Sequence, residues 1–201
     1  MPARRPDPAA PLVGAHVRLE ALTHSDLPAL YEAVGRHPQV FAGGWGGGPA
    51  GFSETREGFE AFARDYFSWN TSNVYAVRAP DGELMGTSTL GDFDLAAEHA
   101  HIGWTAYSPS VWGTAVNPES KLLLLGAAFE HGFGRVKIQA DVLNERSRSA
   151  ILRLGATFEG VVRRDRPRAD GSWRDTAVYS ILVDEWPAVR AGLEQRVASF
   201  G

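Results

Sequence analysis

The chain has 201 residues, with 20 Lys and Arg against 24 Asp and Glu and a formal charge of −4. The absence of cysteine excludes thiol nucleophiles, disulfide frameworks and thiolate-based zinc or iron–sulfur sites, and it favours a cytoplasmic protein. The charge gives no basic field for nucleic acid, and the apolar run over 122–129 is too short to cross a bilayer, so we expect neither nucleic-acid nor membrane partners. The length predicts a single domain, over residues 14–201, and the four prolines and two arginines within residues 1–11 predict a flexible leader over residues 1–13.

The first half of the chain alternates strand and helix signals. Val17, Leu19 and Ala21 alternate with charged residues and predict a first strand over 16–22. Ser25 is the expected cap of a helix whose apolar residues share one face. Six glycines between 41 and 52 surround Trp45 and predict an irregular, mobile loop. Helical spacing predicts another helix over 59–66.

The second half continues this order. Segments 74–78, 84–90 and 100–107 predict an antiparallel meander, and the apolar helix over 122–129 leads to a strand over 136–142. A short helix ends at Gly155, a hairpin follows over 158–163 and 176–183, and a last helix begins near Glu185. The interleaved elements predict an α/β fold of the mixed α+β type.

A turn of small residues lies before the apolar helix, over residues 112–118. Asn117 is the expected cap of this helix and Pro118 its first position, so the backbone amides of the turn are expected to be free. Amides that converge at a helix N-terminus bind phosphate, although an ordinary capped helix has the same sequence and Glu119 competes with an anion. This turn has no GxGxxG motif and the chain has no GxxxxGK[ST] motif, so the turn supports neither a dinucleotide fold nor a P-loop.

The turn, its place before a crossover helix, and the later Asn144, Ser147 and Gly155 together resemble the GNAT acetyltransferase superfamily. The motif that grips the coenzyme A diphosphate falls on Ser110, Gly113 and Ala115. The segments IGWTAYSPSVWGTAVNPESK, NERSRSAILRLGATFEGVVRR and RDTAVYSILVDEW resemble the Rim-type branch, which is similar to ribosomal-protein N-terminal alanine acetyltransferases. The resemblance runs from about His16 to Trp186.

This resemblance implies a GNAT fold, with a largely antiparallel sheet of about six or seven strands flanked by helices. The strand that ends near Tyr107 is expected to splay from the strand over 139–142, and the pantetheine of acetyl-CoA enters the gap by strand addition. Because Ser110 replaces the usual Arg or Gln, the diphosphate is left to backbone amides and to nearby Lys121 or Arg148. The implied cofactor-binding residues are Thr105, Ala106, Tyr107, Trp112, Gly113, Thr114, Ala115, Val116, Asn117, Asn144, Ser147 and Arg148.

The reaction needs a neutral amine, a stabilised oxyanion and a proton for the departing thiolate. The superfamily tyrosine acid is replaced by Ile151, and the Rim-type alternative makes Ser147 the expected acid. His101 is the candidate base by residue type, with a solvated or core-capping strand residue as the alternative. Asn144 caps its helix, binds pantetheine, or does both. The histidines show no metal-ligand spacing, so no metal is expected.

The expected function is acetylation of a protein or peptide α-amino group, which is roughly a tenth neutral at pH 7 and needs less of a base than lysine. Expected acceptor contacts are Trp45, Asp175 and Tyr179. One alternative is a small-molecule acetyltransferase for a polyamine, amino sugar or antibiotic, and another is a non-catalytic acyl-CoA-binding module. The protein is expected to be a monomer or homodimer.

The charge of the acceptor pocket separates these alternatives. Acidic residues there (Asp92, Asp94, Glu98) would favour a polycation as the acceptor. The arginines Arg163, Arg164, Arg166 and Arg168 attract an acidic substrate or the adenosine 3′-phosphate, or form a solvated surface.

Overall fold

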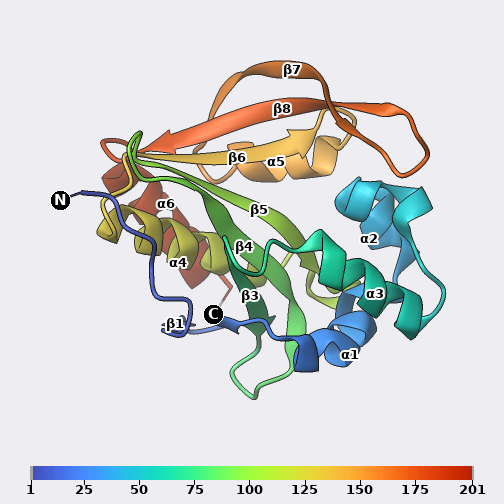
Figure 1. Ribbon diagram of the computed structural model, residues 1–201. Helices are drawn as coiled ribbons and strands as arrows, with labels where there is room; N and C mark the ends of the chain where they lie inside the picture. Colours follow the sequence, from blue (N-terminus) through green and yellow to red (C-terminus); the bar gives the residue numbers. More distant parts are fainter. Residues whose placement is uncertain (1, 201) are drawn as a thin grey trace.

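The computed structural model describes residues 2–200 and contains one eight-stranded mixed sheet (Figure 1). The strand order is β1-β2-β3-β4-β5-β6-β8-β7. The sheet therefore has one or two strands more than the six or seven expected. Neighbouring strands run antiparallel except for β5 and β6, which are parallel and joined through a helix. The predicted meander, crossover and closing hairpin are confirmed. The strands are β1 (Leu12–Val13), β2 (Arg18–Ala21), β3 (Asn73–Arg78), β4 (Leu84–Asp94), β5 (His99–Tyr107), β6 (Arg135–Asp141), β7 (Thr157–Pro167) and β8 (Trp173–Leu182).

Helices cover both faces of this sheet. They are α1 (Leu27–Leu30), α2 (Pro38–Ala42), α3 (Arg56–Tyr66), α4 (Val116–Glu130), α5 (Glu145–Leu152) and α6 (Trp186–Ala198), and α1 continues into a π-helical turn over Tyr31–Gly35. Alternate residues of β3 point to opposite faces of the sheet. Tyr75 and Val77 pack in the core with α4, whereas Val74 and Ala76 pack with α1 and α3. Within residues 2–200, no helix is long and apolar enough to span a bilayer.

The N-terminal segment is attached to the fold at several points, which differs in part from the flexible leader expected over 1–13. Arg5 donates hydrogen bonds to the Asn73 side chain (2.7 Å) and to the backbone carbonyls of Asn70 and Ser72. Leu12 and Val13 form β1, which pairs with β2. Residue 1 lies outside the described residues. The anchoring side chain is a single arginine, and for this reason the proline-rich composition did not reveal it.

Two local predictions in the first half need correction. The helical turn before α1 is capped by Thr23, which forms a capping box with Asp26, and not by Ser25. The glycine-rich segment is not an irregular loop, because it contains the end of α2 and two short 3₁₀ turns (45–47 and 49–51). Trp45 fixes this segment: the indole is 8% exposed and packs among the rings of Phe41, Phe62 and Tyr66.

The parallel strands β5 and β6 separate partway along their length, as the splay prediction requires. Their pairing begins at His99 with Arg135 and ends at Ile102 with Ile138. Beyond this point each strand pairs only on its outer side, β5 with β4 and β6 with β8. Figure 1 shows the two halves of the sheet spreading apart toward α2. The divergence leaves strand edges with unpaired backbone groups in the middle of the sheet.

Candidate functional site

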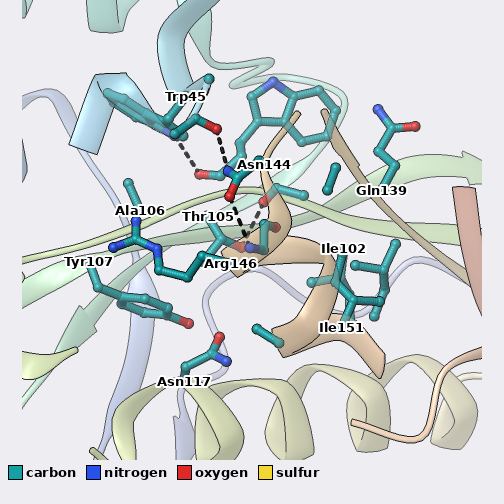
Figure 2. Close-up of a pocket in the computed structure, with 18 of the residues that line it drawn as sticks. Trp45, Ile102, Thr105, Ala106, Tyr107, Asn117, Gln139, Asn144, Arg146 and Ile151 are labelled. Carbon is teal, nitrogen blue, oxygen red and sulfur yellow. Dashed lines mark hydrogen bonds between the residues drawn. The ribbon is translucent and has the colours of Figure 1, made fainter. Parts of the chain in front are cut away.

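A cleft of about 330 Å³ occupies the gap between β5 and β6. Its walls come from the free ends of these strands, the turn before α4, the first turns of α4 and α5, and the glycine-rich segment (Figure 2). The structure thus brings together eleven of the residues expected at the site from sequence: Trp45, His101, Thr105, Ala106, Tyr107, Trp112, Gly113, Thr114, Asn117, Asn144 and Ser147.

A bulge in β5 shapes one wall of the cleft. The register shifts between Thr87 and Thr89 on β4, and opposite this shift Trp104 has a positive φ of 50°. This conformation is uncommon for a bulky residue and is a mark of local strain. The Trp104 carbonyl accepts a hydrogen bond from the Trp45 indole nitrogen at 3.2 Å, which ties the glycine-rich segment to the bulge (Figure 2).

The turn before α4 offers free backbone donors. Among the described residues, the amides of Gly113, Thr114, Ala115 and Asn117 have no protein acceptor. The predicted helix start is wrong by two residues, because α4 begins at Val116 with Ala115 as its N-cap, and Asn117 and Pro118 lie inside its first turn. The free amides at this N-terminus, together with the helix dipole, suit a diphosphate.

Glu119 does not compete with an anion at this turn, contrary to expectation. Its carboxylate accepts hydrogen bonds from the backbone amides of Ala15, His16 and Val17 at 2.7 to 2.8 Å. The side chain is 4% exposed and is directed toward the N-terminal segment. The start of α4 is therefore fastened to the segment that leads into β2.

Asn144 and Ser147 stand at the start of α5. Asn144 is its N-cap, and the side-chain oxygen accepts the Ser147 amide at 2.9 Å, while the side-chain nitrogen donates to the Gly43 carbonyl (Figure 2). The structure thus supports the capping role of Asn144 and adds a link to the glycine-rich segment. Ser147 is half-buried in the cleft wall. Ile151, one turn later, is 5% exposed and lines the same wall.

His101 is buried beside a carboxylate. Its Nδ1 lies 2.8 Å from Asp92 Oδ2, and its Nε2 is buried with no hydrogen-bond partner among the described residues. Burial lowers the pKa of His101, although the bond to Asp92 opposes this shift; the same bond lowers the pKa of Asp92. The ring lies against Gly103, where a Cβ would come within 2.7 Å of it. The result is a neutral imidazole with one free nitrogen in the cleft wall, unlike the solvated strand residue that sequence left open.

Lys121 is buried at the floor of the cleft, 5% exposed. Its Nζ donates to Thr105 Oγ1 at 2.7 Å and to Ser88 Oγ at 3.1 Å, so it faces the sheet and not the turn before α4. Burial lowers its pKa to about 7. This placement corrects its assignment to the diphosphate, because the second turn of α4 directs the side chain inward.

Other expected site residues lie outside the cleft. Arg148 donates to the Tyr179 hydroxyl and to the Val142 carbonyl, both at 3.2 Å, and does not line the cleft, so its contact with the diphosphate stays a prediction. Tyr179 is 1% exposed, and Asp175 is exposed and accepts the Arg164 amide, so the structure places neither acceptor contact in the cleft. Val116 is buried in the core, and its amide donates to the Thr114 hydroxyl.

The acceptor side of the cleft is basic. The three acidic residues that would favour a polycation, Asp92, Asp94 and Glu98, do not line the cleft, and Asp92 is hydrogen-bonded to His101. Arg166 and Arg174 line it instead. Sequence reasoning missed Arg174 because the hairpin was expected to stop at 163 and resume at 176, whereas β7 extends to Pro167 and β8 starts at Trp173.

Comparison with known proteins agrees with this geometry. The Acetyltransferase (GNAT) domain family matches residues 16–157. The Bacillus subtilis protein named "Putative ribosomal N-acetyltransferase YdaF" is 28% identical over 178 residues, covering 87% of this chain and 95% of that protein. A solved GCN5-related N-acetyltransferase from Brucella melitensis is 28% identical, covers 98% of this chain and 88% of its own, and has a TM-score of 0.85.

The fold is also shared by Mycobacterium smegmatis RimJ, solved in complex with CoA-disulfide, at 22% identity, a TM-score of 0.68, and coverage of 91% of this chain and 88% of that chain. The family match covers most of the described chain and includes β5, the turn before α4, and α5. The predicted fold class and enzyme class are confirmed. The chain therefore belongs to the GNAT family of N-acetyltransferases.

Proposed function

We propose that the protein transfers the acetyl group of acetyl-CoA to the N-terminal α-amino group of a protein or peptide. The observation that carries this proposal is the gap between β5 and β6, which opens beyond Ile102 and Ile138 and is flanked by the free amides of the turn before α4. The similarity to a protein named for ribosomal N-acetylation supports a protein acceptor, and such an acceptor would place the enzyme in the cytoplasm.

The coenzyme fits the cleft in two places. The free amides of residues 113–115 and 117 would hold the diphosphate, and the unpaired edge of β5 from Gly103 to Tyr107 would pair with the amides of pantetheine. This arrangement brings the thioester to the middle of the sheet, next to the β5 bulge.

Two side chains of the cleft would carry out the proton transfers of the reaction. The free Nε2 of His101 accepts the proton that the amine loses when its nitrogen attacks the thioester carbon, and Asp92 orients the ring and stabilises the imidazolium. The Ser147 hydroxyl donates a proton to the sulfur as the carbon–sulfur bond breaks, and the serine regains a proton through water from the His101 imidazolium, so that the net transfer is from the amine to the sulfur. The products are the N-acetylated amine and free coenzyme A.

The test is thiol release from acetyl-CoA in the presence of peptides with free N-termini, followed by mass spectrometry of the peptides. The absence of cysteine keeps the protein from contributing a thiol signal. The proposal expects acetylated N-termini, and Ser147→Ala should lower kcat by about a hundredfold or more, as for loss of a general acid. Turnover with small amines but with no peptide would refute the protein acceptor. Saturable coenzyme binding with no turnover of any amine would refute catalysis.

A further inference from the structure

A second cavity adjoins the cleft on its acceptor side. It lies between the glycine-rich segment at Gly44–Gly47 and the β7–β8 hairpin. Arg166 and Arg174 line both this cavity and the cleft, so their side chains stand where the two join. An acceptor that approaches the thioester from this side passes both guanidinium groups.

These two arginines are cross-strand partners in the β7–β8 register. Like charges placed directly opposite each other on neighbouring strands destabilise a sheet. The third arginine of the cavity, Arg168, is neutralised by the buried carboxylate of Asp141. The hairpin therefore holds the positive charges of Arg166 and Arg174 side by side, and the buried Asp141 carboxylate pairs with Arg168 and with neither of them.

Neither guanidinium group is well compensated. Among residues 2–200, no carboxylate lies within 4.0 Å of Arg174, and its Nε is buried with no hydrogen-bond partner. Arg166 is 3.6 Å from Asp165, whose Oδ2 also accepts the Thr176 hydroxyl. A buried donor without a partner carries a desolvation cost that a bound anion would remove.

Arg166 also points toward the reacting centre. Its Cζ lies 6.0 Å from the ring centroid of Trp104, and the Trp104 ring lies 5.1 Å from the His101 imidazole. The Arg166 guanidinium group is thus separated from the proposed base by the ring of Trp104. An acceptor that places its amine at His101 therefore has other groups within reach of the two arginines.

We propose that Arg166 and Arg174 bind a carboxylate of the acceptor, so that the substrate is a peptide with an acidic residue next to its free N-terminus. Guanidinium groups match carboxylates with paired hydrogen bonds, which gives this site its selectivity. This inference rests on the proposed acetylation of N-termini and names the class of N-terminus.

The test compares three peptides that differ only at the second position, with glutamate, glutamine or lysine. The glutamate peptide should have a kcat/KM about ten- to a hundredfold above that of the glutamine peptide, as expected for a hydrogen-bonded charge, and the lysine peptide should be poorer still. Arg166→Gln and Arg174→Gln should raise KM for the glutamate peptide, leave its kcat nearly unchanged, and have little effect on the glutamine peptide. Arg163→Gln is the matched control, since Arg163 is exposed on the same strand and lines neither cavity.

Three results would overturn the inference in distinguishable ways. Equal acetylation of all three peptides would remove the anion preference and leave the proposed function intact. Acetylation of none would remove the proposed acceptor, and the inference with it. Weaker binding of acetyl-CoA to the Arg166→Gln and Arg174→Gln variants, measured by calorimetry without peptide, would assign the arginines to a phosphate of the coenzyme.

Discussion

Replacing Lys121 with methionine is expected to stabilise the folded protein at neutral pH. The fold holds this amine at a pKa of about 7 against an ordinary value of 10.5, a difference of about 3.5 pH units. At about 1.4 kcal/mol per unit, keeping a normally charged group in this site costs about 4 to 5 kcal/mol near and below pH 7. Losing the hydrogen bonds to Ser88 and Thr105 offsets about 1 kcal/mol each, which leaves a net gain of about 2 kcal/mol.

The same shift fixes how this gain depends on pH. Because the pKa is lowered in the folded state, the unfolded state binds more protons between pH 7 and pH 10.5. Wild-type stability therefore rises with pH in this window by about 1.4 kcal/mol per unit through this group, and the variant lacks that rise. The advantage of the methionine variant should shrink steadily above pH 7 and reverse near pH 9.

Urea unfolding of the wild type and of Lys121→Met at pH 7, 8 and 9 measures this difference. Lys137→Met is the matched control, because it removes the other lysine of the chain and its side chain is 29% exposed. The control should show no such pH-dependent advantage. A Lys121→Met advantage that stays constant from pH 7 to pH 9 would refute the reasoning, since it would mean that the amine titrates alike in the folded and unfolded states.

Two further substitutions test the supports of the cleft. Glu119→Ala removes the acceptor of three backbone amides and should cost about 3 kcal/mol, lowering Tm by about 6 to 12 °C in a thermal scan; a Tm within about 2 °C of the wild type would contradict this anchoring role. His101→Gln should lower kcat/KM about a hundredfold in the thiol-release assay, and Asp92→Asn should lower it by less. Because burial lowers the pKa of His101, the acidic limb of the wild-type pH profile should lie below pH 6.5, and a limb well above that value would exclude this histidine as the base.

Periodicity was sufficient for the elements whose packing is regular. The strand signals predict the meander over β3 to β5, whose strands pair in regular register over most of their length. The apolar run predicts α4, which is buried along much of its length. The predicted element boundaries are wrong where a single side chain determines the local structure. Thr23 takes the cap from Ser25 through its capping box with Asp26, and Trp45 orders a glycine-rich segment by entering an aromatic cluster.

The candidate site was recoverable from sequence where it depends on local motifs, and not where it depends on register. Gly113 and Asn144 lie in the cleft wall because each belongs to a turn that leads into a helix. The pairing of His101 with Asp92 depends on the β4–β5 register, which is interrupted by bulges that spacing does not reveal. The opposition of Arg166 and Arg174 depends on how far the β7–β8 hairpin extends through a stretch rich in charged residues.

The central claim is that the turn before α4 holds the diphosphate of acetyl-CoA, and calorimetric titration of Gly113→Leu with acetyl-CoA tests it most directly. Gly113 has a φ of +79°, which strains any side chain, and a Cβ there would meet nothing within 4 Å, so we expect the added side chain to obstruct the proposed anion site. Gly82→Leu is the matched control, with a φ of +95° and equally open space, in the β3–β4 turn. We expect saturable binding by the wild type and the control, and binding about tenfold weaker or worse in Gly113→Leu. Wild-type affinity in a folded Gly113→Leu variant, or no binding by the folded wild type, would contradict the claim.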